Sequence, residues 1–390
     1  MFHSITRLPQ LLPPAAYYSA QAHALDVAAL RQTWQLVGTA DQLAQPGDFL
    51  TADLLDTPII VRNADGKLRA FLNVCAHRHC LLTSLPRGNA PRLRCQYHGW
   101  EYDHEGCAAK IPSPKNFPPL VKGELRLHEL ALEQAGQLVF VRLSDTGPTL
   151  AEQCGESYPV ICGRFGSDFR LAFDWRPLYE ANWKIPVENS LEAYHVPTVH
   201  PETFREDPGE QRSEHSFTPT GSLFEVDMPF SVHSRIDALL QQTQGWVMRR
   251  LGIQPQNRYT LYHVYPNLLF SFTDSVSFCQ ALLPASPTSC QATVLQYSPR
   301  GAGVAWPRRI LAHAWGALAA KITRTILEED RRLFADIQRG VKSARDPGLL
   351  GRCEERLHAF QKYMLPNYHG LELLSDTCRR DASSPESTHD

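Results

Sequence analysis

The sequence predicts an α+β protein of two domains, an all-β domain followed by a domain with an antiparallel sheet and a long C-terminal helix. Residues 34–143 hold short runs rich in β-branched and aromatic residues, separated by Gly, Pro, Asn and Asp. Residues 215–300 hold further alternating strands, and residues 305–345 keep a helical pattern throughout. A chain of 390 residues is long enough to build two or three cores.

Changes in pattern along the chain set the expected boundaries. The second domain should open with a linker near residues 144–170, contain a helical stretch within 171–200, and close with a shorter helix at 349–364. We therefore expect an N-terminal arm that packs on the second domain, the β domain, the second domain and a polar tail: residues 1–33, 34–143, 144–378 and 379–390.

The composition excludes several classes of function. A net charge of −2 argues against nucleic acid as a partner. No apolar run approaches the roughly 18 residues that span a membrane, and the Pro-interrupted start lacks the apolar core of a signal peptide. Eight of the ten cysteines are scattered without framework spacing, so we expect reduced thiols and a cytoplasmic location.

Two short segments of the β domain carry a metal-ligand pattern. Cys75 and His77 lie in NVCAHRHC, and Cys95 and His98 lie in LRCQYHGW, which gives C-x-H, seventeen residues, then C-x-x-H. In a Rieske [2Fe–2S] cluster two Cys hold one iron and two His hold the other. The pattern therefore predicts a Rieske cluster and one-electron chemistry.

A structural zinc site is the alternative for these four residues, because zinc also accepts two Cys and two His. Zinc sites usually place the two Cys in one short segment and the two His in another, whereas each segment here carries one of each. His79 and Cys80 would break this pairing, so we interpret them as non-ligands.

A second candidate site lies in the segment 182–204. Glu192, His195 and His200 are spaced E-x-x-H-x-x-x-x-H. We expect Pro197 to end or kink a helix between the two His, so that both imidazoles can aim at one point. Two His and one carboxylate with open positions form the facial triad of mononuclear Fe(II) oxygenases.

The third ligand should come from the long helix. Asp330 falls on its apolar stripe, and a buried carboxylate is costly unless it is paired or binds metal. Glu329 and Asp336 lie off this stripe and should be solvated. We expect His195, His200 and Asp330 to bind iron, and the alternative is that Asp330 pairs with a neighbouring Arg. The residues of the stripe are Ile322, Ile326, Leu333 and Ile337.

Six motifs together resemble the Rieske non-haem iron oxygenases, the ring-hydroxylating dioxygenase α-subunit family. The motifs are NVCAHRH, CQYHGW, NWK…EN, YH followed by H, YPNL and EED…DIQRG, and the likeness covers nearly the whole chain. The resemblance implies a Rieske [2Fe–2S] domain followed by a helix-grip (START-like) catalytic domain.

The resemblance also implies cofactors and partners. Each chain would hold one Rieske cluster and one mononuclear Fe(II), use O2 as cosubstrate, and take electrons from a separate NAD(P)H-dependent reductase, with or without a ferredoxin. Head-to-tail homotrimers would place each cluster beside a neighbour's iron. The bridging carboxylate would be Glu192, where most relatives have Asp, and Asn189 matches an Asn close to the iron.

Glu at the bridging position is similar to the branch of choline, glycine-betaine and carnitine monooxygenases. We therefore expect a monooxygenase acting on a quaternary ammonium or related small molecule. The alternatives are an α subunit of an aromatic ring-hydroxylating dioxygenase, or a pure electron carrier. Aromatic residues in the second domain could hold a quaternary ammonium, line an apolar slot or simply form core: Trp246, Tyr259, Tyr262, Tyr265, Phe270, Phe272 and Phe278.

Overall fold

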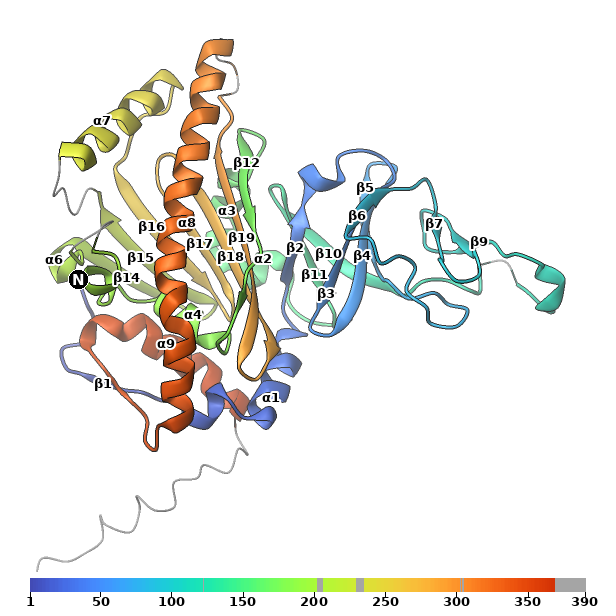
Figure 1. Cartoon of the computed structure of the whole chain (residues 1–390), viewed down its shortest axis with the longest axis horizontal. Helices are drawn as coiled ribbons and strands as arrows, with labels where there is room; N and C mark the ends of the chain where they lie inside the picture. The colour runs from blue at the N-terminus through green and yellow to red at the C-terminus, as the bar shows by residue number, and fades with distance from the viewer. Residues whose placement is uncertain (122, 202–205, 229–234, 302, 304, 369–390) are drawn as a thin grey trace, which may run out of the picture.

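The computed structural model shows a β-rich domain beside a larger domain of sheet and helices (Figure 1). This arrangement confirms the expected α+β class and the order of the two parts along the chain. No helix within the described part has the length and apolar content to cross a bilayer. The structure describes residues 1–121, 123–201, 206–228, 235–301, 303 and 305–368, so the expected polar tail lies outside it.

The first domain is built from antiparallel strands. In the described residues its main sheet has the order β2-β11-β10-β5-β4-β3-β6, and a small sheet has the order β7-β8-β9. The strands of the main sheet are β2 Gln35–Thr39, β3 Asp48–Leu54, β4 Thr57–Ala64, β5 Lys67–Leu72, β6 Arg87–Asn89, β10 Glu129–Ala135 and β11 Leu138–Arg142. Those of the small sheet are β7 Leu93–Arg94, β8 Glu101–Tyr102 and β9 Ala108–Lys110.

The hairpin between β4 and β5 shows how local sequence sets this sheet. Asp65 and Gly66 connect the two strands, and both have positive φ angles, 55° and 93°. Two such residues form the type I′ turn, whose twist matches that of antiparallel strands. The side chain of Asn63 accepts a hydrogen bond from the Gly66 amide at 2.6 Å and fixes the turn.

The second domain is a strongly curved antiparallel sheet crossed by the long helix α8 (Figure 1). Its strand order among the described residues is β12-β19-β18-β17-β16-β15-β14, and β13 pairs with β19. The strands are β12 Phe169–Trp175, β13 Leu178–Tyr179, β14 Ser213–Thr218, β15 Gly221–Asp227, β16 Arg258–Val264, β17 Leu268–Phe272, β18 Ser277–Ser286 and β19 Ser289–Pro299. Helix α8 spans Trp306–Ser343, which confirms the predicted long helix.

Shorter elements complete the two domains. The α-helices are α1 Ala20–Leu30, α2 Leu150–Cys154, α3 Tyr158–Arg164, α4 Lys184–Asn189, α5 Val196–Val199, α6 Gly209–Arg212, α7 Arg235–Arg250 and α9 Glu355–Met364. The 3-10 helices are η1 Pro14–Tyr17, η2 Ala40–Leu43, η3 Pro114–Asn116, η4 Gly155–Ser157, η5 Arg352–Glu354 and η6 Leu365–Tyr368. Two short strands, β1 Leu8–Pro9 and β20 Leu349–Leu350, pair with each other.

Three local expectations were wrong. The expected linker near 144–170 contains α2 and α3, because Leu150, Cys154 and Ile161 pack into the core behind the sheet. The strand-rich region 215–300 also contains α7, which packs its apolar side on α8. The last helix begins at Glu355 and not at 349, because Leu349 and Leu350 form a strand with the N-terminal segment.

A buried ion pair ties the N-terminal segment to the second domain. Lys184 of α4 lies 2.5 Å from Asp26 of α1, and both side chains are fully buried. The indole nitrogen of Trp183 donates to the same carboxylate at 2.9 Å. The NWK motif is therefore an anchor, because each charge would be costly to bury without its partner.

All described cysteines are free thiols, as the sequence predicted, and Cys378 lies outside the described residues.

The stability of the fold should depend on the protonation of Glu188. Burial raises the pKa of this carboxyl to about 7, although it accepts hydrogen bonds from Tyr17 and Gln361. The folded state then binds a proton that the unfolded state releases near pH 4.5, so this contribution is present below pH 4.5 and is lost as pH rises to 7. Chemical denaturation of Glu188→Gln should remove a slope of up to about 1.4 kcal/mol per pH unit in that window.

The exposed Glu156→Gln is the control for this measurement and should keep the wild-type slope. An unchanged pH profile in Glu188→Gln would show that Glu188 does not titrate in the folded state over this range.

Candidate metal centres and substrate cavity

The four predicted cluster ligands converge in two loops of the β domain. The side chains of Cys75 and Cys95 are buried, whereas His98 is exposed and His77 half-buried. The two imidazole rings lie 4.7 Å apart. Buried sulfurs and outer imidazoles fit a two-iron cluster whose His-bound iron faces the surface.

The arrangement of the donors also favours a cluster over a single zinc ion. The Cys75 side chain interacts with that of Cys95, and the ring of His77 neighbours that of His98. Pairing of Cys with Cys and His with His is the ligand arrangement of a Rieske cluster. Burial raises the pKa of the Cys75 thiol, so its thiolate form calls for a bound metal.

The two loops share one backbone design. The amide of His79 donates to the carbonyl of Cys75 at 3.0 Å, and Gly99 donates to Cys95 at the same distance. His79 and Gly99 both have positive φ, 58° and 71°. His79 thus occupies the left-handed position that glycine fills in the second loop, and its side chain is exposed. We therefore still interpret His79 and Cys80 as residues that do not bind the cluster.

Tyr102 supports the first loop from the core of the domain. Its hydroxyl lies 3.0 Å from the Cys75 sulfur and accepts a hydrogen bond from the Ala76 amide at 3.0 Å. A hydroxyl that donates to a cluster sulfur raises the reduction potential of the cluster. Tyr102 is fully buried, so this contact is shielded from water.

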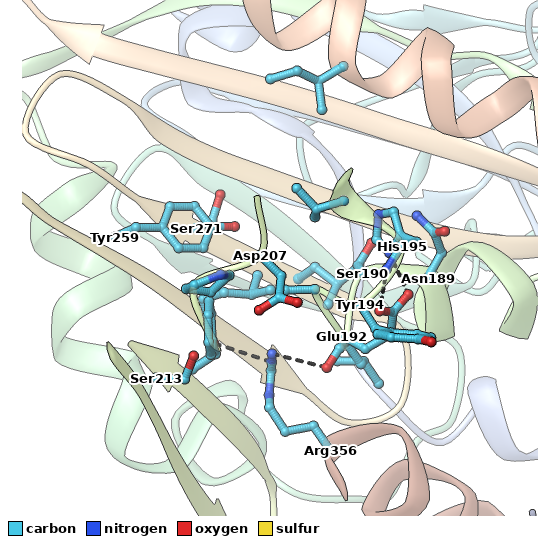
Figure 2. A pocket seen from close by; sticks show the side chains of 18 of the residues that line it. Asn189, Ser190, Glu192, Tyr194, His195, Asp207, Ser213, Tyr259, Ser271 and Arg356 are labelled. Carbon is cyan, nitrogen blue, oxygen red and sulfur yellow. Dashed lines mark hydrogen bonds and ion pairs between the residues drawn. The ribbon is translucent and has the colours of Figure 1, made fainter. Parts of the chain in front are cut away.

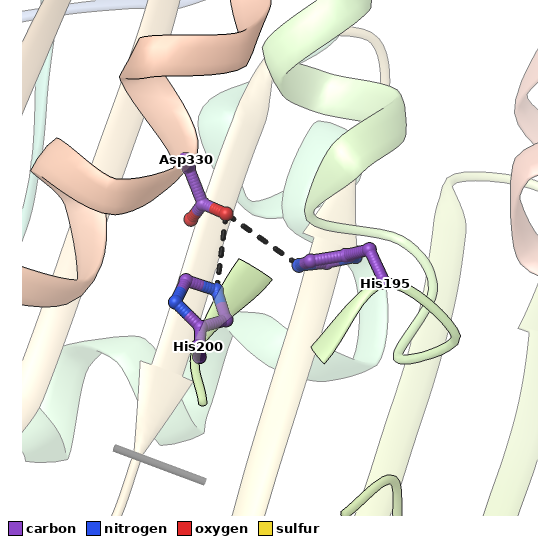
Figure 3. Close-up of side chains that lie close together, drawn as sticks. All are labelled: His195, His200 and Asp330. Atoms are coloured by element: carbon purple, nitrogen blue, oxygen red, sulfur yellow. Dashed lines mark ion pairs between the residues drawn. The ribbon is translucent and has the colours of Figure 1, made fainter. Parts of the chain in front are cut away.

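The second centre brings together His195, His200 and Asp330 (Figure 3). The Nε2 atom of His200 lies 3.1 Å from Asp330 Oδ1, and His195 Nε2 lies 3.5 Å from the same oxygen. His195 and His200 cap the two ends of the one-turn helix α5, and Asp330 comes from α8. Segments 130 residues apart in the sequence therefore meet at one point.

The role expected for Pro197 was wrong. It neither ends nor kinks a helix, because α5 begins at Val196 and Pro197 lies in its first turn. Proline is well tolerated there, since first-turn amides have no partner within the helix. The break occurs earlier, in the turn after α4, and Glu192 lies in that turn.

Asp330 is buried, but not on the stripe that the sequence suggested. Ile322, Leu333 and Ile337 are each more than a third exposed, while the buried face of α8 is offset from them and combines small, aromatic and polar residues. The ion pairs of the described residues do not join Asp330 to an Arg, and Arg331 pairs with Glu328 at 3.0 Å. The buried residues of α8 are Ala312, Trp315, Gly316, Ala319, Ala320, Asp330, Phe334 and Gln338.

Two further carboxylates fix the orientation of both imidazoles. His195 Nδ1 is bonded to Glu192, which also accepts from the His195 amide at 3.1 Å. His200 Nδ1 lies 2.7 Å from Glu329 Oε2. A ring that donates from Nδ1 presents the lone pair of Nε2, which is the arrangement of metal-binding His.

The expectation that Glu329 is solvated was therefore wrong, whereas Asp336 is exposed as predicted. The Glu329 side chain is only 14% exposed, because His200 at the C-terminal end of α5 lies against it.

These contacts leave three electron-pair donors facing one point. Asp330 Oδ1 is buried and has no hydrogen-bond donor in the structure, because both neighbouring Nε2 atoms carry lone pairs. Burial lowers the pKa of His200, but the carboxylates of Asp330 and Glu329 more than compensate and raise it. The arrangement fits a divalent cation, and two His with one carboxylate is the Fe(II) triad.

A cavity of about 340 Å³ opens at this triad, between the inner face of the sheet and α8 (Figure 2). Of the aromatic residues considered from the sequence, Tyr259 and Phe278 line it. Phe270 and Phe272 point to the opposite face of the sheet, as strand alternation requires. Asn189, at the end of α4, lines the cavity on the side of His195.

Two charged lining residues were not found from the sequence. Asp207 and Arg356 both face the cavity (Figure 2). Arg356 lies on the buried side of α9 next to Leu357 and Phe360, and that helical spacing was the signal available in the sequence. No comparable pattern surrounds Asp207.

Comparison with known proteins tests the resemblance. Residues 165–369, more than half of the chain, match the family described as ring hydroxylating alpha subunit (catalytic domain). The chain belongs to this family. Residues 33–130 match the Rieske [2Fe-2S] domain. Both ligand sets thus lie in the domains that carry a Rieske cluster and mononuclear iron in ring-hydroxylating oxygenases.

Relatives of this chain include both mono- and dioxygenases. The glycine betaine monooxygenase oxygenase subunit of Chromohalobacter salexigens is 30% identical over 195 residues, covering 49% of this chain and 43% of that protein. The large oxygenase component of the naphthalene 1,2-dioxygenase system of Pseudomonas putida is 32% identical over 182 residues, covering 45% and 40%. The chain thus matches about half the length of such relatives.

Solved structures of the family share the fold. A quaternary ammonium Rieske monooxygenase, CntA, in complex with L-carnitine has a TM-score of 0.72 and 21% identity, covering 92% of this chain and 95% of that one. Naphthalene 1,2-dioxygenase from Rhodococcus bound to indole has a TM-score of 0.71 and 17% identity, covering 92% and 95%.

Replacing Asp330 should separate the two metal centres. Asp330→Ala removes the carboxylate that faces both imidazoles, so the second-domain iron should fall to near zero per chain while the visible absorbance of the cluster persists. Asp336→Ala, on the same helix but 75% exposed, should keep both centres. Metal analysis together with the visible spectrum checks this, and full iron content in Asp330→Ala would remove Asp330 from the ligand set.

Glu329 should matter for iron affinity without binding iron itself. Glu329→Gln weakens the acceptor for His200 Nδ1, so iron affinity should fall by about 10–100-fold. The neighbouring Glu328→Gln alters only a surface pair with Arg331 and should bind iron normally. Competition with a ferrous chelator measures both variants, and equal affinities would show that Glu329 does not support His200.

Proposed function

We propose that this chain is the terminal oxygenase component of a Rieske non-haem iron system that hydroxylates a small quaternary ammonium or related compound. The observation that carries the proposal is the convergence of His195, His200 and Asp330 on one point in the wall of a cavity. When bound, iron at this triad supplies O2 activation, and a reduced Rieske cluster supplies the further electron that forming a hydroxylated product and water requires.

The residues around the triad have positioning roles in this proposal. Glu192 and Glu329 hold the two imidazoles so that their Nε2 atoms face the cavity. Asn189 lies on the cavity wall beside them and can donate a hydrogen bond to a group bound there. The apolar lining from the sheet and α8 excludes water from the reacting atoms, which strengthens each of these polar contacts.

The cavity suits a small cationic substrate. Its volume of about 340 Å³ is at the lower end of the range for ligand sites. Phe224, Tyr259 and Phe278 contribute aromatic rings, which attract quaternary ammonium groups. Asp207 adds a carboxylate, which accepts a hydrogen bond from the backbone amide of Gly209. Oxidation of a methyl group on such a substrate gives a hemiaminal that loses an aldehyde.

We also propose that the working enzyme is a cytoplasmic homotrimer with electron transfer between subunits. The small sheet β7-β8-β9, which flanks Cys95 and His98, lies at the end of its domain away from the catalytic sheet (Figure 1). A study of CntA reports inter-subunit electron transfer in that protein. Glu192 would then bridge His195 to a neighbour's His77 or His98, and a separate NAD(P)H-dependent reductase would reduce the cluster.

The alternative substrate class is an aromatic ring, as for the α subunit of a ring-hydroxylating dioxygenase. The apolar part of the cavity favours it, since Leu269, Val276 and Leu327 give a smooth wall that a flat ring can contact. The relatives from naphthalene dioxygenase systems belong to this class.

Single-turnover oxygenation decides between these substrates. Iron-loaded, dithionite-reduced protein is mixed with O2 and either trimethylammonium compounds or substituted benzoates, and products are read by mass spectrometry. We expect an oxidised product and released aldehyde from the ammonium set, at about one product per reduced centre. Asp330→Ala is the inactive control.

Products from the benzoate set alone would favour the alternative function, that of a ring-hydroxylating dioxygenase α subunit. Absence of product from both sets, with the cluster reoxidised by O2, would contradict both proposed substrate classes.

A further inference from the structure

Arg356 is a buried cation on the wall of the cavity (Figure 2). It is 1% exposed, and its hydrogen bonds go to neutral acceptors, the Ser222 hydroxyl at 3.2 Å and the carbonyls of Leu191 and Leu261 at 3.5 and 3.4 Å. The ion pairs of the described residues do not include Arg356. A guanidinium has five N–H donors, so one on each terminal nitrogen is left for a ligand.

Burying an unpaired charge is costly, so this arrangement calls for a counterion. Burial lowers the pKa of Arg356 to about 10, so the side chain remains protonated at neutral pH. The charge of Arg356 also affects neighbouring groups. The pKa of His215 is lowered to about 4, mainly by burial and next by the charge of Arg356. Arg356 likewise adds to the depressed pKa of His263, which is about 3.

The acidic groups around the cavity are engaged elsewhere. Glu355, the residue before Arg356, binds His215 and the amides of the N-terminal segment. Glu192 is bonded to His195. Asp207 lines the cavity but forms no ion pair with Arg356, and its Oδ1 accepts from the Gly209 amide at 2.6 Å.

Arg356 is close to the reacting end of the cavity. It bonds to the carbonyl of Leu191, which immediately precedes Glu192 and begins the turn that leads to His195. A ligand bound by Arg356 would therefore lie against the cavity wall that also carries Glu192 and His195. The ring of Phe224 covers the guanidinium on one side, with its centroid 5.7 Å away.

We propose that Arg356 binds a carboxylate of the substrate, and that the substrate is a small zwitterion or anion and not a simple cation or a neutral ring. The inference rests on the proposed function only in placing the substrate in this cavity. Carboxylates are the natural partners of a guanidinium because they accept two of its N–H groups at once. A trimethylammonium acid satisfies Arg356, the aromatic wall and Asp207 together.

Equilibrium binding tests this without turnover. Calorimetry on anaerobic holoenzyme compares two matched pairs that differ in the anionic group, glycine betaine against choline and benzoate against benzyl alcohol. We expect the wild-type protein to prefer the carboxylate in at least one pair. Arg356→Gln should weaken binding of that carboxylate by about 10–100-fold and binding of the alcohol in the same pair by less than threefold.

Two variants keep the result interpretable. Arg356→Lys retains the positive charge but loses the forked geometry, so it should fall between wild type and Arg356→Gln. Arg339→Gln removes an arginine that is 85% exposed on α8 and should bind all four ligands as wild type does. The visible spectrum and melting temperature show whether each variant is folded. If Arg356→Gln does not fold, the wild-type preference within the pairs and the Arg356→Lys variant decide.

No carboxylate preference in the wild-type protein, or equal weakening of both members of a pair by the substitution, overturns the proposal. Selective carboxylate binding without any product in single turnover contradicts the oxygenase function and leaves the role of Arg356 in place. Product from choline or benzyl alcohol without a carboxylate preference would support the oxygenase function and contradict the role of Arg356.

Discussion

Three electron-pair donors facing one buried point form the constraint on which the rest of the structure depends. His195 and His200 both use Nδ1 to bind a glutamate, so their Nε2 lone pairs face the carboxylate oxygen of Asp330. Burial lowers the pKa of His200, but the carboxylates of Asp330 and Glu329 raise it, so a proton can take the place of an absent cation. Metal affinity and local stability are therefore coupled, and the carboxylates behind the rings favour a divalent ion.

The scaffold supplies rigidity where this site needs it. Asp330 lies in the long helix α8, which packs on β12 and β19 of the sheet, so packing along α8 fixes its position. The two imidazoles belong to an irregular segment, but that segment follows α4, which the buried pair of Lys184 and Asp26 ties to the N-terminal part of the chain. The NWK motif thus serves the metal site through structure and not through contact with it.

The candidate metal ligands could be proposed from the sequence, whereas most of their surroundings could not. Cys75, His77, Cys95 and His98 lie in short motifs whose spacing is set by local chemistry. Asp330 was proposed from helical periodicity. The apolar stripe used for that proposal is largely exposed, but Asp330 lies beside it on the helix and is buried. Glu329, Asp207 and Arg356 were missed because their roles arise from tertiary contacts. Their positions follow from contacts between elements far apart in the sequence, such as His200 with Glu329, which the local sequence does not encode.

The most direct test of the account is to count and classify the iron in the purified, reconstituted chain. Mössbauer spectroscopy with acid-labile sulfide analysis should find three irons and two sulfides per chain, two irons in a Rieske cluster and one as high-spin Fe(II). Reduction should give the electron paramagnetic resonance signal of a mixed-ligand cluster. Zinc in the β domain, or a chain that holds the cluster but never binds the third iron, would contradict the account.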